Sequence, residues 1–115
     1  MIYISPKQRK SLSVFRESLY KHLKEHDLRY SDQREQVLKI LYKQSCPTTI
    51  DKLVLILSSE YRKSASYPTV ARHVNFFREM GWLQVANKSH KEYILVKVPP
   101  NYEENIYEMD DYDPL

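Results

Sequence analysis

With 115 residues, 42% of them hydrophobic and 29% charged, the chain can form one domain with one modest hydrophobic core. It has no apolar run near the ~20 residues of a membrane span, no signal-peptide pattern in MIYISPKQRK and a single cysteine, so a cytoplasmic protein without a disulfide or a membrane segment is expected. The net charge of +3 divides into residues 1–98, with all 18 Lys and Arg against 9 acidic residues, and residues 99–115, with 6 acidic residues and no Lys or Arg.

Hydrophobic spacing and turn residues predict two helices in the first half of the chain. The first extends from about Pro6 to His26, and residues 27–30 interrupt its pattern as a turn. Ser31 is expected to cap a second helix, which ends at Cys46-Pro47 because the residue before a proline avoids helical geometry. The apolar stripe of the first helix consists of Leu12, Phe15, Leu19 and Leu23.

Two further helices follow. Thr48 is expected to cap the third, with Asp51 at the third helical position in a capping-box arrangement. Ser66 is expected to cap the fourth, SYPTVARHVNFFREMGWL, whose Pro68 is tolerated because first-turn amides have no helical partner. Gly81, the only glycine, suits the left-handed residue after a helix end.

After the fourth helix the hydrophobic period changes. WLQVA and EYILVKV are rich in β-branched and aromatic residues, and with NKSHK between them they predict a β-hairpin. Three packed helices, a presented fourth helix and this hairpin predict a mainly α fold, a winged helix-turn-helix, over residues 1–98. Residues 99–115 are expected to form a separate acidic tail.

The fourth helix and the hairpin carry side chains suited to DNA. The polar face of the helix holds Ala71, Arg72 and Asn75, and in the major groove Arg pairs with guanine and Asn with adenine. Ser66, Thr69 and the free first-turn amides suit a phosphate, and Tyr67 can project past the helix end. A solvated polar face and an exposed basic turn are the alternatives. The basic hairpin tip, which suits a phosphate backbone or the minor groove, contains Lys88, His90 and Lys91.

Two stretches, LKEHDLRYSDQREQVLKILYKQSCPTTIDKL and YPTVARHVNFFREMGWLQV, resemble the DNA-binding domain of the ferric uptake regulator family of bacterial repressors. That family shows Gly-Leu-Arg/Lys, Thr-Pro-x-Arg, His-Pro-Thr, Ala-Thr-Val-Tyr-Arg and Ala-Gly in this order. The resemblance covers roughly residues 12–97. The matching positions are Leu28-Arg29, Ser31, Gln33, Arg34, Pro47-Thr48, Thr69-Val70, Arg72 and Gly81.

The resemblance implies contacts with DNA for five of these positions. It places Arg29 near the minor groove or the backbone, and Ser31 and Arg34 near phosphates. It places Thr69 and Arg72 at the major groove. Double-stranded DNA is therefore the expected partner.

The chain departs from the family pattern in base reading and in metal ligands. The family's Tyr, which meets thymine, is Ala71 here, so the family's operator preference is not implied. Members carry a second domain with His-rich and Cys-x-x-Cys metal sites, whereas this chain has no Cys-x-x-Cys. His22 and His26 lie one turn apart without an evident third ligand, and Cys46 is expected to be at least half-buried. No metal or cofactor is expected.

Two functions remain open from the sequence. The first is a sequence-specific DNA-binding transcription regulator without metal sensing, and the second is a winged-helix module that binds a partner protein. The acidic tail could compete with DNA, capture a second copy, bind another protein, or only increase solubility. An enzyme is not expected, because the sequence shows no Gly-rich phosphate loop, paired carboxylates or nucleophile beside a base.

Overall fold

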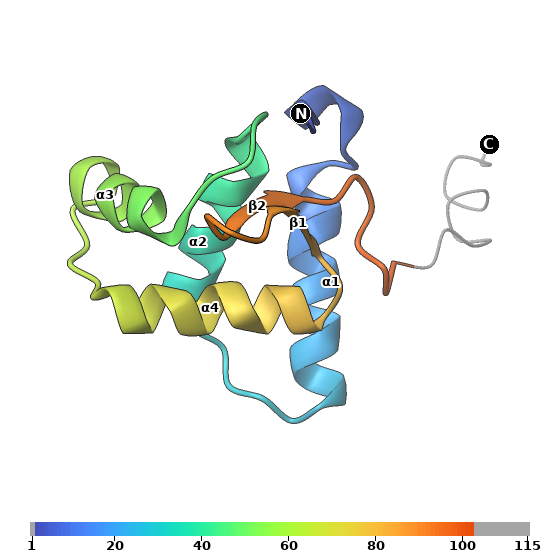
Figure 1. Cartoon of the computed structure of the whole chain (residues 1–115). Coiled ribbons are helices and arrows are strands. Elements are labelled where there is room, and N and C mark those ends of the chain that lie inside the picture. The colour runs from blue at the N-terminus through green and yellow to red at the C-terminus, as the bar shows by residue number, and fades with distance from the viewer. Residues whose placement is uncertain (1, 103–115) are drawn as a thin grey trace.

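The computed structural model describes residues 2–102, which form four α-helices and one two-stranded antiparallel hairpin (Figure 1). α2 is central, since it contacts the other three helices and the second strand. The hairpin follows the last helix directly, which is the predicted winged helix-turn-helix. The elements are a 3-10 turn at Pro6–Gln8, α1 (Leu12–Glu25), α2 (Asp32–Lys43), α3 (Ile50–Glu60), α4 (Tyr67–Glu79), β1 (Leu83–Asn87) and β2 (Glu92–Leu95).

A serine or threonine begins each α-helix by accepting a hydrogen bond from a first-turn amide. Ser31 Oγ accepts from the amide of Arg34 at 3.1 Å, which confirms the predicted cap of α2. Ser66 Oγ accepts from the amide of Thr69 at 3.4 Å, which confirms the predicted cap of α4. These caps are local interactions, so short sequence patterns were sufficient to predict them.

The predicted cap of the third helix is wrong by one residue. Thr49 begins α3, and its Oγ1 accepts from the amide of Lys52 at 3.2 Å. Thr48 is instead buried, and its amide and carbonyl each pair with Tyr93 of β2 at 2.8 Å. The segment before α3 thus adds a bridge to the hairpin, and this tertiary pairing decides which threonine is left to cap the helix.

The predicted start of the first helix is also wrong. The helix begins after Ser11, whose Oγ accepts from the amide of Val14 at 3.3 Å, and Pro6–Gln8 form a separate turn. Between them Arg9 has an extended backbone and is only 6% exposed. Its guanidinium donates to the carbonyls of Leu95 at 3.1 Å and Tyr42 at 2.7 Å. This anchor holds the N-terminal segment against β2 and α2 and away from a helical path.

The hairpin is joined tightly to α4 by a left-handed turn. Gly81 has φ +81°, as predicted, and its amide donates to the Arg78 carbonyl at 2.9 Å. β1 then pairs with β2 from Leu83↔Leu95 to Asn87↔Glu92, with a bulge between Val85 and Asn87. A bulge increases the local twist of a ribbon. Residues 88–91 form the tip (Figure 1).

An aromatic cluster fixes α4 and the hairpin to the rest of the core. The rings of Phe77 and Trp82 stack at 5.5 Å between centroids, and Phe15 meets Trp82 edge-on at the same distance. All three side chains are fully buried. Because Phe15 comes from α1, Phe77 from α4 and Trp82 from the start of the hairpin, this cluster sets how far α4 projects from the other helices.

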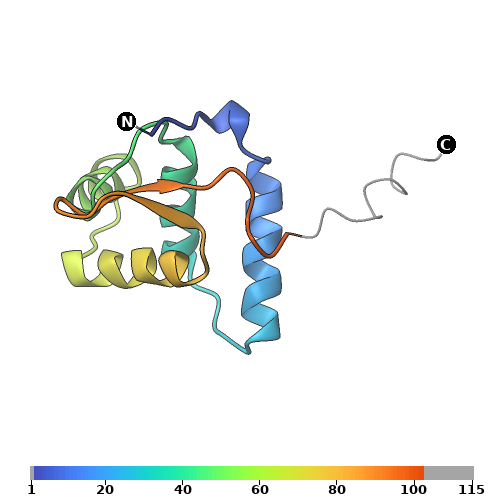
Figure 2. The same ribbon diagram turned by 45° about the vertical axis from the view of Figure 1, so that its right-hand side comes forward.

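Residues after β2 return to α1 rather than to α4 (Figure 2). Asn101 Nδ2 donates to the Ser18 carbonyl at 2.9 Å, and Lys10 Nζ lies 5.3 Å from the centre of the Tyr102 ring. The acidic tail beyond this point lies outside the described residues. Within residues 2–102, no helix combines the length and the apolar character needed to cross a membrane.

Candidate nucleic-acid interface

The face of α4 opposite the core is open to solvent. Val70, Val74 and Phe77 are fully buried, whereas Arg72 and Asn75 are exposed. Neither of these two polar side chains has a hydrogen bond or an ion pair with another residue that the structure describes. The structure therefore places the Arg72 guanidinium and the Asn75 amide on the exposed side of α4, opposite the core, as the sequence predicted.

The first turn of α4 carries polar side chains, while the Thr69 amide already donates to Ser66 Oγ and Pro68 has no amide N–H. Ser66 is exposed, and its hydroxyl lies 3.0 Å from the Oγ1 of Thr69, which is half-buried. Tyr67 is 44% exposed and is the first residue of the helix. A helix N-terminus carries partial positive charge and favours an anion such as phosphate.

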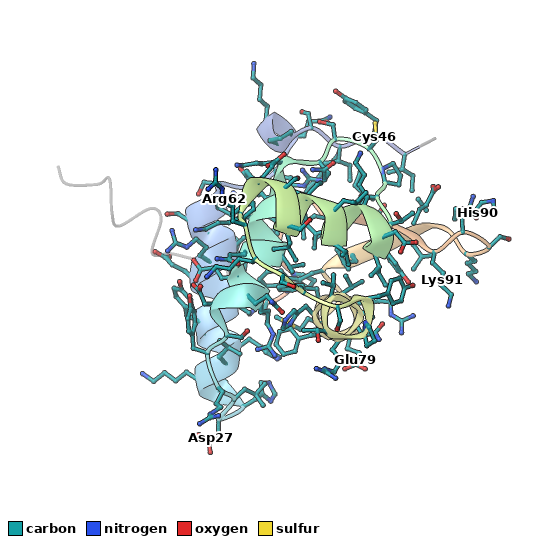
Figure 3. The ribbon with its side chains drawn as sticks, turned by 90° about the vertical axis from the view of Figure 1, so that its left-hand side faces the viewer. Asp27, Cys46, Arg62, Glu79, His90 and Lys91 are labelled. Atoms are coloured by element: carbon teal, nitrogen blue, oxygen red, sulfur yellow. The ribbon has the colours of Figure 1, made fainter. Side chains whose placement is uncertain are left out.

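Two projections flank α4. Figure 3 shows α4, with Glu79 labelled, between Asp27 of the α1–α2 connection and the hairpin tip at His90 and Lys91. The hairpin tip is basic, since Lys88 and Lys91 are exposed there, whereas the connection carries the exposed Arg29 close to the exposed Asp27 and has no net charge. A helix between these two projections has the shape of a surface that follows a duplex, with positive charge concentrated at the hairpin tip.

The sequence prediction did not include Arg78, which belongs to this surface. Arg78 of α4 joins Lys88 and Lys91 of the tip around a hollow of about 250 Å³, with Val85 and Tyr93 as its apolar walls. Three cations around one small hollow favour a phosphate group. The sequence places Arg78 on α4, but only the packing of the hairpin against α4 brings it beside the two lysines.

Arg34 and Ser31 are only partly exposed, as Thr69 is, whereas the other predicted contacts are exposed. Ser31 is half-buried as the cap of α2. The Arg34 guanidinium lies 4.0 Å from the centre of the Phe76 ring, and Nη1 donates to the Arg29 carbonyl at 3.4 Å. Burial lowers the pKa of Arg34 from its ordinary value. These contacts fix the direction of the Arg34 side chain before any ligand arrives.

A buried carboxylate, which the sequence prediction missed, holds the connection that carries Arg29. Glu35 is 4% exposed, its Oε2 lies 2.7 Å from Arg16 Nε, and it accepts hydrogen bonds from the hydroxyls of Tyr20 at 2.9 Å and Tyr30 at 2.5 Å. Burial alone would raise the pKa of Glu35, but the two hydroxyls and the Arg16 charge outweigh it, and the pKa lies below its ordinary value. α1, α2 and the connection are thereby tied together.

A buried histidine lies directly beneath the exposed face of α4. His73 is 9% exposed, and its Nε2 is 3.0 Å from Gln33 Oε1 of α2. Burial, with the positive charges of Arg34 and Arg72, lowers the pKa of His73 to about 4. The sequence contained no signal for this pair, because residues 33 and 73 meet only when α2 and α4 pack.

Acid should therefore destabilise the fold through His73. The folded state favours the neutral ring, so its contribution is complete above pH 6.5 and is lost as the pH falls towards 4. Between pH 7 and pH 4, we expect the free energy of unfolding of the wild type to fall by about 1–2 kcal/mol more than that of His73→Gln. Urea denaturation followed by Trp82 fluorescence measures both. His90→Gln, at the exposed tip, should follow the wild type, and an equally steep loss in His73→Gln would contradict the prediction.

Two other expectations are wrong in detail. Cys46 is exposed rather than half-buried, in the segment between α2 and α3. Ala71 was placed on the polar face of α4, but it is half-buried and packs against the core. The exposed polar face of α4 is thus narrower than the helical wheel suggested.

The resemblance to a metal-dependent family raises the question of a metal site. His22 and His26 lie with ring centroids 4.3 Å apart at the end of α1. Across residues 2–102, however, no three His, Cys, Asp or Glu side chains come together in a way that could hold an ion. The described residues therefore do not fit a metal centre of the kind that needs three protein ligands.

Comparison with known proteins places this geometry in a family. A sequence model described as the ferric uptake regulator family matches residues 25–106. No curated protein gives a significant match. A zinc uptake regulator solved with zinc and DNA has a TM-score of 0.64 and 23% identity, over 76% of this chain and 57% of that one. The ferric uptake regulator Fur of Helicobacter pylori, described with three functional metal-binding sites, has a TM-score of 0.66 and 21% identity, over 84% of this chain and 61% of that one.

These comparisons support one conclusion about the fold and another about the family. At such identities the likeness to solved structures shows a shared fold, and the chain spans about three fifths of the length of those proteins. The family model covers well over half of the present sequence. The chain therefore belongs to the ferric uptake regulator family.

Proposed function

We propose that the chain is a sequence-specific DNA-binding transcription regulator that reads the major groove with α4. The observation that carries the proposal is the free, exposed pair Arg72 and Asn75 on a helix that lies between the basic hairpin tip and the connection that carries Arg29. α4 has 13 residues, a length of about 20 Å, which fits a groove about 12 Å wide and open at both ends.

The proposed contacts divide into base reading and backbone positioning. Arg72 and Asn75 meet base edges, with Thr69 and Tyr67 at the leading end of the helix. Around them, phosphates are held by side chains from three places: Arg29, Ser31 and Arg34 near the connection, Ser66 at the helix start, and Arg78, Lys88 and Lys91 at the hairpin. The present chain shares its fold with a structural neighbour solved with zinc and DNA, which supports DNA as the ligand.

Selection of bound fragments from a random pool of duplexes tests the proposal. We expect one enriched sequence, and an affinity whose logarithm falls linearly with the logarithm of salt, by about 0.9 for each phosphate contact. A palindromic site would indicate that two copies bind together. If no sequence is enriched and the affinity for DNA does not change with salt concentration, the chain is better explained as a module that binds a partner protein.

We further propose that DNA binding by this chain needs no metal ion. The described residues bring together no set of three metal ligands, which supports this. Affinity for the selected site should agree within about twofold between buffers containing EDTA and buffers containing micromolar zinc. A tenfold difference, measured by fluorescence anisotropy on labelled duplex, would show that an ion contributes.

We propose that the chain has two parts, a DNA-binding unit up to about residue 98 and an acidic tail from residue 99. The negative charge of the tail competes with DNA for the basic surface of the unit. Asn101 contacts Ser18 of α1 and Tyr102 lies beside Lys10, so the test begins the deletion at residue 103 and removes all six acidic residues. We expect non-specific DNA binding to tighten several-fold at about 50 mM salt, and the difference to disappear as salt screens the charges. A variant with the six acids changed to amides is the matched control. Equal affinities of the full chain and the deletion variant at every salt concentration would show that the tail does not compete with DNA.

A further inference from the structure

A pocket of about 600 Å³ lies between the end of α1, the α1–α2 connection and the C-terminal half of α4. Sites for small organic molecules have volumes of about 300–1,000 Å³. Leu28, Phe76 and Met80 supply its apolar surface, and Arg29 and Arg34 supply charge. Nothing in the DNA-reading surface requires a pocket of this size.

Arg34 of α2 lines this pocket with a guanidinium that is already held in position. Its guanidinium lies 4.0 Å from the centre of the Phe76 ring, so its plane is held in place. Its Nε is buried and has no hydrogen-bond partner among the residues that the structure describes. Because Nε itself has almost no accessible surface, a carboxylate in the pocket meets the guanidinium at its terminal nitrogens, where charge-assisted hydrogen bonds are strong.

The charge of the lining favours an anion. Two guanidinium groups, of Arg29 and Arg34, face a single carboxylate, that of Glu79. The remaining polar groups are the rings of His22 and His26, and the His22 ring meets Phe76 edge-on at 5.6 Å. A neutral apolar ligand would leave both guanidinium groups without a counter-charge, whereas a carboxylate beside a flat apolar body matches both kinds of lining.

We propose that this pocket binds a small organic anion with a flat apolar body. The carboxylate pairs with Arg34 and Arg29, and the body packs against Leu28, Met80 and the accessible part of Phe76. The pocket's effect on DNA binding rests on the proposed function: Arg29 serves both ligands, so an occupied pocket weakens the hold of the connection on DNA.

Titration of the full chain with 2-naphthoate tests the site without DNA. Calorimetry and the Arg34 Nε–H resonance should show saturable binding with a dissociation constant on the order of 1 mM, as expected for a ligand of this size. The neutral analogue 2-naphthalenemethanol should bind at least about tenfold more weakly, because it lacks the charge that the two guanidinium groups recognise. Equal affinity for the two compounds would overturn the proposal.

Three variants, each of which removes one positive charge, distinguish binding in the pocket from non-specific attraction of the anion to a basic protein. Arg34→Gln and the exposed Arg29→Gln should each weaken 2-naphthoate binding, by about tenfold and severalfold respectively. Lys52→Gln, on the exposed side of α3, should bind it like the wild type. Wild-type affinity in both arginine variants would also overturn the proposal.

A second measurement keeps this site and the proposed function apart. With 10 mM 2-naphthoate, about tenfold above that dissociation constant, DNA affinity should fall several-fold against the same concentration of chloride, and that of Arg34→Gln should fall by no more than about twofold. Saturable anion binding by a chain that ignores DNA would support the pocket and refute the proposed function. If DNA affinity does not change when the pocket is saturated, the ligand in the pocket does not compete with DNA.

Discussion

Arg72→Ala should lower the affinity for the selected DNA site by about 1–3 kcal/mol, a factor of roughly 5 to 150, and should relax the preference at one base pair. The guanidinium of Arg72 is exposed and unpaired among the described residues, so no protein contact competes with a guanine. Because Arg72 lies on the outer face of α4, its removal leaves the core intact. Anisotropy titrations with the selected site and with each single-base variant measure the effect.

Lys88→Ala is the matched comparison for this prediction. Lys88 is also an exposed cation, but it lies at the hairpin tip beside Arg78 and Lys91. It should weaken binding to all duplexes alike and reduce the slope of affinity against salt by about one unit. If Arg72→Ala instead lowers affinity uniformly for every sequence, Arg72 contacts the backbone and α4 does not read bases through it.

Phe77→Ala should lower the free energy of unfolding by about 3–5 kcal/mol, a large part of the stability of a domain of this size. Phe77 is fully buried on α4 and stacks on Trp82 at 5.5 Å, so the truncation leaves a cavity between α4 and the start of the hairpin. Urea denaturation followed by Trp82 fluorescence measures the loss. Since the same cluster fixes the projection of α4, DNA affinity should fall as well in conditions where the variant is folded.

Tyr3→Ala provides the control of similar size. Tyr3 is 62% exposed in the N-terminal segment, and a substitution there should change stability by no more than about 0.5 kcal/mol. If Phe77→Ala lowers the free energy of unfolding by as little as Tyr3→Ala does, α4 is held by contacts other than this aromatic cluster.

Most of the fold could be predicted from the sequence because helices, caps and turns depend on residues that are close together in the chain. Helical spacing of apolar residues located the four helices, Ser31 and Ser66 marked two of their starts, and Gly81 marked the turn into the hairpin. Each of these features depends on backbone conformation within a few residues. The errors occurred where distant groups compete for the same backbone, as Tyr93 does for Thr48.

The candidate site was predictable only in part for the same reason. Exposure of Arg72, Asn75, Lys88 and Lys91 follows from the period of a helix and from the tip of a hairpin. The pairs His73–Gln33 and Glu35–Tyr20 join residues far apart in the chain, and no short pattern encodes them.

The sequence by itself determined the helices, the hairpin and the side of α4 that faces solvent, because periodicity and capping act over a few residues. Only the tertiary structure decided which cations share a hollow, which carboxylate and histidine are buried, and that the connection, α1 and α4 enclose a pocket. Those outcomes depend on how elements pack across long stretches of chain, where many residues together set each distance.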